Sequence, residues 1–506
     1  MRTGYAVKNT VASILVEIVT AISGIILPRF FIGVYGSSVN GLVSSIGQFI
    51  TYMGLVEAGV SAAATVELYG PLASNDQGRI NVIISTAKQF YKRSGVFFTA
   101  LILLLIGVYP YIVRNEITDE SFVRLMIVVL SLNGVIDYFI LGKYRVLLVA
   151  DQKTYILALA TAAGTLLTML FSIALILLHC SPILVKSVAA IVYFLRTLFV
   201  IWYVRKHYPF LDLGVDVSNN SFPQRHSALF HQIVGTICNY TDIILLTILL
   251  RENALVEVSV YSAYNMVGAN LSKLFDSICA GVSASFGDII AQDDRIALHK
   301  TFNVFELLCF ILLFIIYACM SVLLFSFISL YTASFTDAAL YARRELVILF
   351  SACGLIQNLR ISGLTVLLAA GHYKQTRGAA LIEAIINLGV SIILIGKLGI
   401  IGVLIGTLAA YLFRSTQVIV YNARCLVQGS LSVTFRRLLR NTVLFAVLVI
   451  MGCLVLSPLI QSWMSWLCYA MVYFVLCSCL FVAFNYLFEP DIVKECISYA
   501  RSIVQK

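Results

Sequence analysis

Charged residues are scarce in this chain of 506 residues: they make up 12% of the total, against roughly 25% in an average soluble domain. Proline is also rare, with eight residues, and none is expected at the middle of a helix. The sequence has no G-x-x-x-x-G-K-[ST] motif, so no ATP-binding loop of this type is expected. The twelve cysteines are scattered through apolar runs without metal-ligand spacing. We therefore expect neither a metal site nor a cofactor.

Hydrophobic residues make up 60% of the chain. They form runs of the roughly 20 residues that a helix needs to cross a bilayer, without the alternating pattern of membrane β-strands. The sequence therefore predicts an all-α integral membrane protein with about 14 transmembrane helices. The predicted spans cover roughly residues 10–28, 39–63, 94–113, 123–142, 155–178, 183–203, 230–250, 255–280, 301–328, 343–370, 375–396, 398–421, 441–460 and 464–487.

The basic residues of the loops predict the orientation. If the N-terminus is cytoplasmic, the inner segments carry roughly three times as many Lys and Arg residues as the outer segments. An even number of spans then returns the C-terminus to the cytoplasm. The net charge of +10 is explained by this bias, so we expect no nucleic-acid partner.

The chain repeats its own plan at an offset of about 220 residues. The segment VLLVA at residues 146–150 matches VLLAA at 366–370, and YFLRTLFVIWY at 193–203 matches YLFRSTQVIVY at 411–421. Because this offset corresponds to six spans, an even number, we expect two parallel-repeat six-helix lobes that enclose a cleft, plus two C-terminal helices. The predicted parts are an N-lobe at 1–204, a cytoplasmic inter-lobe connection at 205–229, a C-lobe at 230–421, and the last two spans with a cytoplasmic tail at 422–506.

Several charged residues fall within or close to the predicted spans. Inserting a charged side chain into the membrane costs at least ~2.5 kcal/mol, even on the scales that give the lowest values, unless the side chain contacts water or an opposite charge. The candidate substrate-binding cations are Arg29, Arg196, Lys273, Arg360 and Arg414. The candidate ion-coupling acids are Glu17, Asp137, Asp242, Asp276 and Glu383.

Some of these candidates have simpler explanations. Arg196 and Arg414 lie close enough to the inner ends of their spans to reach the lipid headgroups. Lys273 and Asp276 are three residues apart, so they could form an ion pair within their own helix. Arg196 and Arg414 are each preceded three residues earlier by a tyrosine, so ring and guanidinium share a helix face.

Two polar stripes and one glycine motif complete the pattern. On the span at 375–396, polar residues recur every four positions: Glu383, Asn387 and Ser391. The matching span of the first half has a similar face: Thr161, Thr165, Thr168 and Ser172. These faces either line the cleft or hold helices together. The stretch GIIGVLIGT at 399–407 contains a G-x-x-x-G motif that allows helices to approach closely.

The sequence resembles bacterial polysaccharide repeat-unit flippases of the Wzx type, in the multidrug/oligosaccharidyl-lipid/polysaccharide exporter superfamily. The resemblance lies in LPRFFIGVYGSSVNGLVSSIGQFITYMGLVEAG at 27–59, LYGPLA at 68–73 and TAKQFYK at 86–92. The later GHYKQTRGAALIEAIINLGVS at 371–391 and GIIGVLIGT resemble the second half of the same family. The resemblance extends over nearly the whole chain.

This resemblance implies two six-helix lobes around a central cavity, two extra C-terminal helices, and a location in the bacterial cytoplasmic membrane. It implies alternating access that carries an undecaprenyl-diphosphate-linked oligosaccharide from the inner to the outer leaflet for capsule or O-antigen synthesis. Membrane lipids, H+ or Na+, and the polysaccharide polymerase machinery are the other expected partners.

The alternative function is a cation-coupled multidrug and toxin antiporter of the same superfamily, whose cavity would favour acids over cations. An enzyme is not expected, because no nucleophile and base converge in the sequence, so no catalytic residue is proposed.

Overall fold

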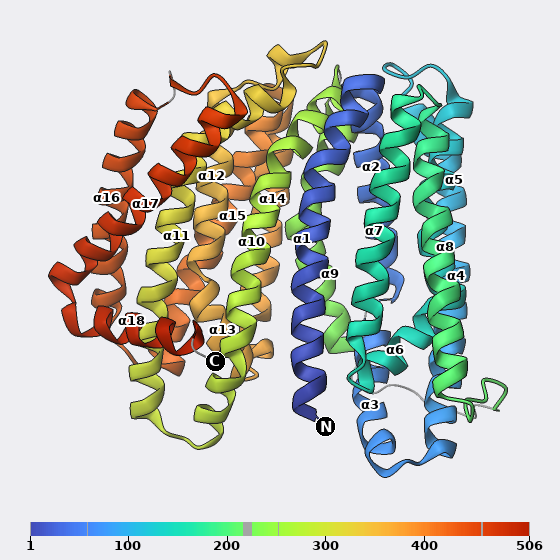
Figure 1. The fold of residues 1–506 in the computed structure, drawn as a ribbon, viewed down its shortest axis with the longest axis horizontal. Coiled ribbons are helices and arrows are strands. Elements are labelled where there is room, and N and C mark those ends of the chain that lie inside the picture. The colour runs from blue at the N-terminus through green and yellow to red at the C-terminus, as the bar shows by residue number, and fades with distance from the viewer. Residues whose placement is uncertain (1, 58, 216–224, 251, 457–458, 505–506) are drawn as a thin grey trace. The chain divides into compact units, whose positions relative to one another are not determined.

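The computed structural model describes residues 2–57, 59–215, 225–250, 252–456 and 459–504, which form helices and loops with no β-strand among them (Figure 1). The predicted all-α class is therefore confirmed. The chain divides into two compact units, Met1–Ser259 and Val260–Lys506. Residues 216–224 of the predicted connection lie outside the described residues, and the predicted lobe boundaries stay a prediction.

The described residues of the first unit form nine α-helices, two short helical turns and the start of a tenth helix. Their bounds are α1 (Arg2–Tyr35), α2 (Ser37–Met53), η1 (Gly54–Glu57), α3 (Val60–Ser74), α4 (Gln77–Ile112), α5 (Glu120–Ile136), η2 (Asp137–Leu141), α6 (Gly142–Ala150), α7 (Thr154–Leu177), α8 (Pro182–His207), α9 (Arg225–Leu249) and the first residues of α10 (Ala254–Ala291).

The second unit contains the rest of α10 and the helices that follow it. Their bounds are α11 (Arg295–Thr332), η3 (Ala338–Leu340), α12 (Arg344–Leu359), α13 (Ile361–Ala369), α14 (Tyr373–Leu398), α15 (Ile400–Tyr421), η4 (Asn422–Leu426), α16 (Leu431–Val455), α17 (Trp463–Phe488) and α18 (Pro490–Val504). Figure 1 shows α16 and α17 side by side in red, with α18 turning away from the end of α17.

Twelve helical stretches in the described part of the chain are long and apolar enough to cross a membrane. Helices α9 and α10 lie at the predicted spans 230–250 and 255–280 but are not among these twelve. Helices α4 and α11 have 36 and 38 residues. At about 1.5 Å per residue, both are longer than the ~30 Å hydrocarbon core. The sequence predicted only their apolar parts, because the polar turns that extend them lack a hydropathy signal.

The two halves repeat hydrogen bonds as well as sequence. Asp76 and Asp294 begin α4 and α11, and each carboxylate accepts a hydrogen bond from the backbone N–H three residues later, at 3.0 and 2.9 Å. Ser172 and Ser391, on α7 and α14, each donate to the backbone carbonyl of a valine in the following helix, at 3.4 and 3.3 Å. Both pairs have the offset of about 220 residues found in the sequence. Equivalent residues therefore make the same hydrogen bonds in each half.

Each half also contains a membrane helix that is interrupted near the same repeat position. In the first half, a π-helical turn, η2, separates α5 from α6. In the second half, Arg360 forms the junction between α12 and α13. The sequence ended the first of these spans at residue 142, whereas the helix continues to Ala150. Interrupted membrane helices expose backbone groups and change the direction of side chains, so these junctions are places where a polar site can form.

Helices α14 and α15 pack as closely as the glycine motif predicted. A Cβ atom on Gly406 would lie 2.2 Å from the Ser391 hydroxyl oxygen, and one on Gly402 would lie 2.7 Å from the backbone of Leu394. Gly399 makes the turn between the helices with a φ of +56°, a conformation that favours glycine. This packing fixes Glu383 on α14 relative to the arginine on α15.

Candidate functional site

The C-half cluster consists of Arg360, Glu383 and Arg414, which come from the α12–α13 junction, α14 and α15. Arg360 Nη1 lies 2.6 Å from Glu383 Oε1, and Arg414 Nε lies 3.6 Å from Glu383 Oε2. Glu383 is 4% exposed and Arg414 is 7% exposed. The fold thus brings together three residues that the sequence singled out separately, and it gives two guanidinium groups to one buried carboxylate.

Arg414 has further partners inside the second unit. Its Nη1 donates to the side-chain oxygen of Gln417 at 2.6 Å and to the carbonyl of Thr376 at 3.4 Å. The guanidinium carbon of Arg360 lies 5.4 Å from the centre of the Tyr411 ring. These contacts hold the two cations against α14 and α15, which does not favour the alternative that Arg414 extends to the headgroups.

Arg196 occupies the equivalent place in the first half. Its Nη1 donates to Thr161 Oγ1 at 3.1 Å, and its guanidinium carbon lies 4.2 Å from the centre of the Tyr193 ring. Arg196 and Arg414 occupy matching positions of the repeat, and each contacts the preceding span. In the first half the partner on that span, Thr161, is neutral, and Arg196 is only half-buried, so snorkelling stays open for it.

A second polar group in the first half, the N-half cluster, is formed by Glu57, Asp137 and Arg145. Arg145 Nη2 lies 2.7 Å from Glu57 Oε1, and its Nη1 lies 2.9 Å from Asp137 Oδ2. Tyr91 donates to Glu57 at 2.6 Å, and Tyr193 donates to Asp137 at 3.1 Å. Asp137 belongs to η2, so the helix interruption positions this acid. Glu57 and Arg145 border a cavity of about 560 Å³.

The remaining candidates do not join these clusters. Glu17, Lys273 and Asp276 are exposed, and no ion pair joins Lys273 to Asp276 among the described residues. Arg29 is half-buried. Asp242 on α9 is 4% exposed, which makes it a deeply buried acid of the first unit.

Sequence reasoning missed Glu57 and Arg145. Glu57 falls inside the predicted span 39–63, so its position was itself a signal. Arg145 was counted as a loop residue because the preceding span was ended at 142; the helix in fact continues through it. Placing the end of that span correctly would have put Arg145 among the candidates.

No family model matches the chain, and no curated protein matches it at the level of sequence. Solved structures do match. An inward-facing multidrug-resistance MATE family transporter of the MOP superfamily matches with a TM-score of 0.65 and 11% identity, covering 83% of this chain and 98% of that one. The lipid II flippase MurJ in an inward closed conformation matches with a TM-score of 0.64 and 14% identity, covering 96% and 99%. An outward-facing MATE transporter matches with a TM-score of 0.53 and 13% identity, covering 84% and 95%.

At these identities the likeness shows the fold. This chain is a multi-pass membrane protein with the fold shared by MATE transporters and the MurJ flippase, which are transporters and a flippase rather than enzymes. Fold alone does not assign a cargo.

Proposed function

We propose that this protein flips undecaprenyl-diphosphate-linked oligosaccharide repeat units from the inner to the outer leaflet of the bacterial cytoplasmic membrane, by alternating access, for the synthesis of a surface polysaccharide. Both termini are then cytoplasmic, as the distribution of basic loop residues favours. Support at the level of fold comes from the match to a lipid flippase, which covers 96% of this chain against 83% for the MATE transporter.

The observation that carries the proposal is the charge of the C-half cluster. Arg360 and Arg414 present two positive charges to the single carboxylate of Glu383. A site built to hold a cationic drug would need the opposite balance, because two guanidinium groups repel a cation. A diphosphate would neutralise this excess of positive charge, since guanidinium groups bind phosphate oxygens through charge-assisted and often bidentate hydrogen bonds.

The geometry supports a particular role for Glu383. In the absence of cargo it neutralises the arginines, which would otherwise be costly among apolar helices. A diphosphate that reaches the cluster can take over as their partner, beginning with Arg414, whose nitrogen is 3.6 Å from the carboxylate against 2.6 Å for Arg360. The weaker pair is the easier one to exchange.

We assign a supporting role to Arg196 in the first half. Its guanidinium is held by Thr161 and Tyr193, neither of which neutralises it. Arg196 and Arg414 occupy the same repeat position, so each half has one arginine there. Arg29 and Lys273 remain candidates for contacts with the phosphates or sugars. Among the acids, Asp242 is our first candidate for H+ or Na+ coupling because it is 4% exposed, whereas Glu17 and Asp276 are exposed.

Deletion of the gene followed by analysis of the surface polysaccharide tests the proposal. A flippase of this cargo predicts loss of the polymer and accumulation of lipid-linked repeat units on the inner leaflet, both restored by the wild-type gene. Normal polymer in the deletion strain, without a second flippase gene, would contradict the proposal.

The second candidate function is a cation-coupled multidrug antiporter. It is favoured by the buried acid Asp242 and by the match in fold to MATE transporters. This function predicts that deletion raises sensitivity to amphipathic cations and leaves the polysaccharide unchanged. The two phenotypes, scored in one strain, separate the two candidates.

A further inference from the structure

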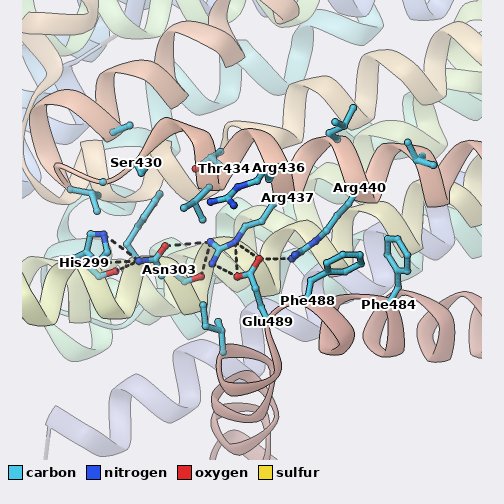
Figure 2. A pocket seen from close by; sticks show the side chains of 18 residues that line it. His299, Asn303, Ser430, Thr434, Arg436, Arg437, Arg440, Phe484, Phe488 and Glu489 are labelled. Carbon is cyan, nitrogen blue, oxygen red and sulfur yellow. Dashed lines mark hydrogen bonds and ion pairs between the residues drawn. The ribbon is translucent and has the colours of Figure 1, made fainter.

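A cavity of about 830 Å³ lies within the second unit, where α11, α16 and α17 meet α18 (Figure 2). This volume is within the ~300–1,000 Å³ range of ligand pockets. Most of its residues come from the first turns of α11 and α16, which begin at Arg295 and Leu431, and from the last turns of α17, which ends at Phe488. The cavity therefore lies at the ends of membrane helices, near the level of the lipid headgroups. None of the cations and acids of the C-half cluster lines it.

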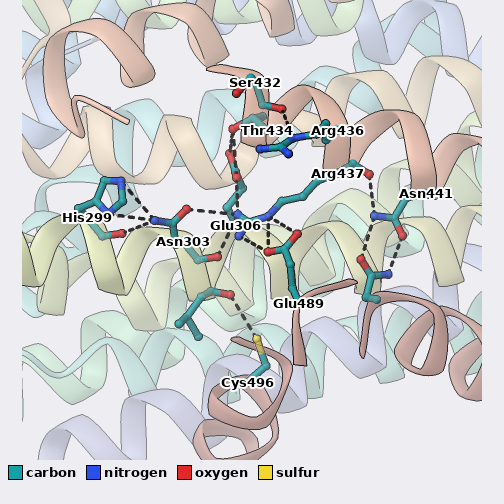
Figure 3. Close-up of polar contacts among 12 residues, drawn as sticks. His299, Asn303, Glu306, Ser432, Thr434, Arg436, Arg437, Asn441, Glu489 and Cys496 are labelled. Atoms are coloured by element: carbon teal, nitrogen blue, oxygen red, sulfur yellow. Dashed lines mark hydrogen bonds and ion pairs between the residues drawn. The ribbon is translucent and has the colours of Figure 1, made fainter. Parts of the chain in front are cut away.

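One wall of the cavity carries three arginines, two of which are neutralised. Arg437 is fully buried, and its nitrogens donate to Glu489 at 2.5 Å and to Glu306 at 2.9 Å (Figure 3). Arg440 lies 2.7 Å from the other oxygen of Glu489. These pairs join α11, α16 and the end of α17.

Arg436 is the cation left over. Three guanidinium groups face two carboxylates in this region, so the balance is one positive charge. Arg436 is exposed, its Nε donates to the carbonyl of Ser432 at 3.2 Å, and no acid pairs with it in the described part of the chain. In Figure 2 it lies beside Thr434 and above Arg437, with Arg440 to the right. Its terminal nitrogens are suited to an anionic oxygen.

The rest of the lining includes apolar residues beside these arginines. They are Leu439, Val443, Phe484 and Phe488, and the guanidinium carbon of Arg440 lies 5.6 Å from the centre of the Phe488 ring. A single cavity thus offers a cation at the level of the headgroups and an apolar wall that continues along two membrane helices. An anionic amphiphile matches this arrangement, whereas a free anion would use only half of it.

We propose that this cavity binds one anionic glycerophospholipid of the inner leaflet, with its phosphate at Arg436 and an acyl chain along Leu439 and Val443. The inner leaflet is the source, because basic loop residues place this end of the helices in the cytoplasm, and basic pockets between membrane helices on that side bind anionic headgroups. The lipid would be a resident ligand and not the transported cargo.

Native mass spectrometry of the full chain, titrated separately with phosphatidylglycerol and phosphatidylcholine, tests this inference. We expect wild type to retain one phosphatidylglycerol molecule in preference to phosphatidylcholine. Loss of one basic contact is expected to reduce that preference about five-fold in Arg436→Gln, and Arg436→Lys should keep part of it. The matched control is Arg424→Gln, an exposed arginine at the same end that does not line the cavity, and it should behave as wild type.

Three results would overturn the inference: no preference for phosphatidylglycerol in wild type, equal losses in Arg436→Gln and Arg424→Gln, or selective retention of undecaprenyl phosphate instead of phosphatidylglycerol. Equal losses in the two variants would mean that anionic lipid is attracted to the basic surface in general. Retention of undecaprenyl phosphate would assign the cavity to the carrier lipid. This experiment does not use the polysaccharide phenotype of the deletion strain. Failure of the lipid-binding inference is therefore distinguishable from failure of the proposed function.

Discussion

Replacement of Arg414 is the most direct test of the C-half cluster. In Arg414→Ala, Glu383 keeps Arg360 at 2.6 Å, so the carboxylate is not left unpaired. The variant also loses the hydrogen bonds of Arg414 to Gln417 at 2.6 Å and to the Thr376 carbonyl at 3.4 Å. The shorter of these bonds sets the expected loss of stability, about 1.5–3 kcal/mol. Glu383→Gln removes the shared acid from both arginines and should destabilise the protein more, by about 3–5 kcal/mol. The order of these two effects follows directly from the pairing geometry.

The same hydrogen-bond energy sets the expected effect on cargo. If Arg414 holds a phosphate oxygen, its loss should weaken binding roughly 10- to 150-fold. Arg414→Lys should lie between wild type and alanine, because lysine keeps the charge but loses the planar pair of donors. Arg196→Ala should be milder, since Arg196 is only half-buried and its hydrogen-bond partner is a neutral threonine.

The assay is polymer export at matched membrane abundance, together with binding of the lipid-linked oligosaccharide to purified protein. Arg424→Ala is a suitable control, because this exposed arginine lies outside the C-half cluster. Normal export and normal binding by Arg414→Ala would refute the phosphate-holding role. Equal defects in the alanine and lysine variants would also count against it, because they would indicate a structural requirement for arginine alone.

Three further changes test the structure itself. Arg437→Met leaves the buried Glu306 without its cation and should cost about 3–5 kcal/mol of stability, measured by thermal unfolding in detergent. Burial alone would raise the pKa of Glu489, but the hydrogen bonds and charge of the neighbouring arginines lower it below its ordinary value of 4.5. Its pairing should therefore stabilise the protein above that pH and be lost as the pH falls through the lowered pKa, a dependence that Glu489→Gln should remove. Gly406→Ala should destabilise the α14–α15 pair by about 1–3 kcal/mol, whereas Gly389→Ala, which meets open space, should not.

Much of the fold could be predicted because membrane helices carry strong local signals. Apolar runs fixed the position of most spans, and the G-x-x-x-G motif predicted the close packing at Gly406. Helix ends were harder to place. The polar extensions of α4 and α11 continue the helix beyond the apolar run, and their starts are set by the capping residues Asp76 and Asp294. Capping of this kind is a local contact that hydropathy does not register.

The candidate site was predicted in its residues but not in its pairings. Glu383, Arg360 and Arg414 were each identifiable as costly charges within spans, and the repeat connected Arg414 with Arg196. That Arg360 and Arg414 share one carboxylate depends on how three helices pack, which spacing along the chain does not encode. The same limit applies to Arg437 and Glu306, which are 131 residues apart and pair only in the folded protein.

The repeat itself offers a physical reason for the difference between the halves. Each half places an arginine against the preceding span, but its partner there is Thr161 in the first half and Glu383 in the second. Threonine offers a neutral hydroxyl, which suffices for a half-buried arginine that water or headgroups can reach. Arg414 is buried and Arg360 is half-buried, and together they need an anion, because an unpaired charge within a membrane helix costs several kcal/mol. The acid at Glu383 is therefore coupled to the second cation at Arg360.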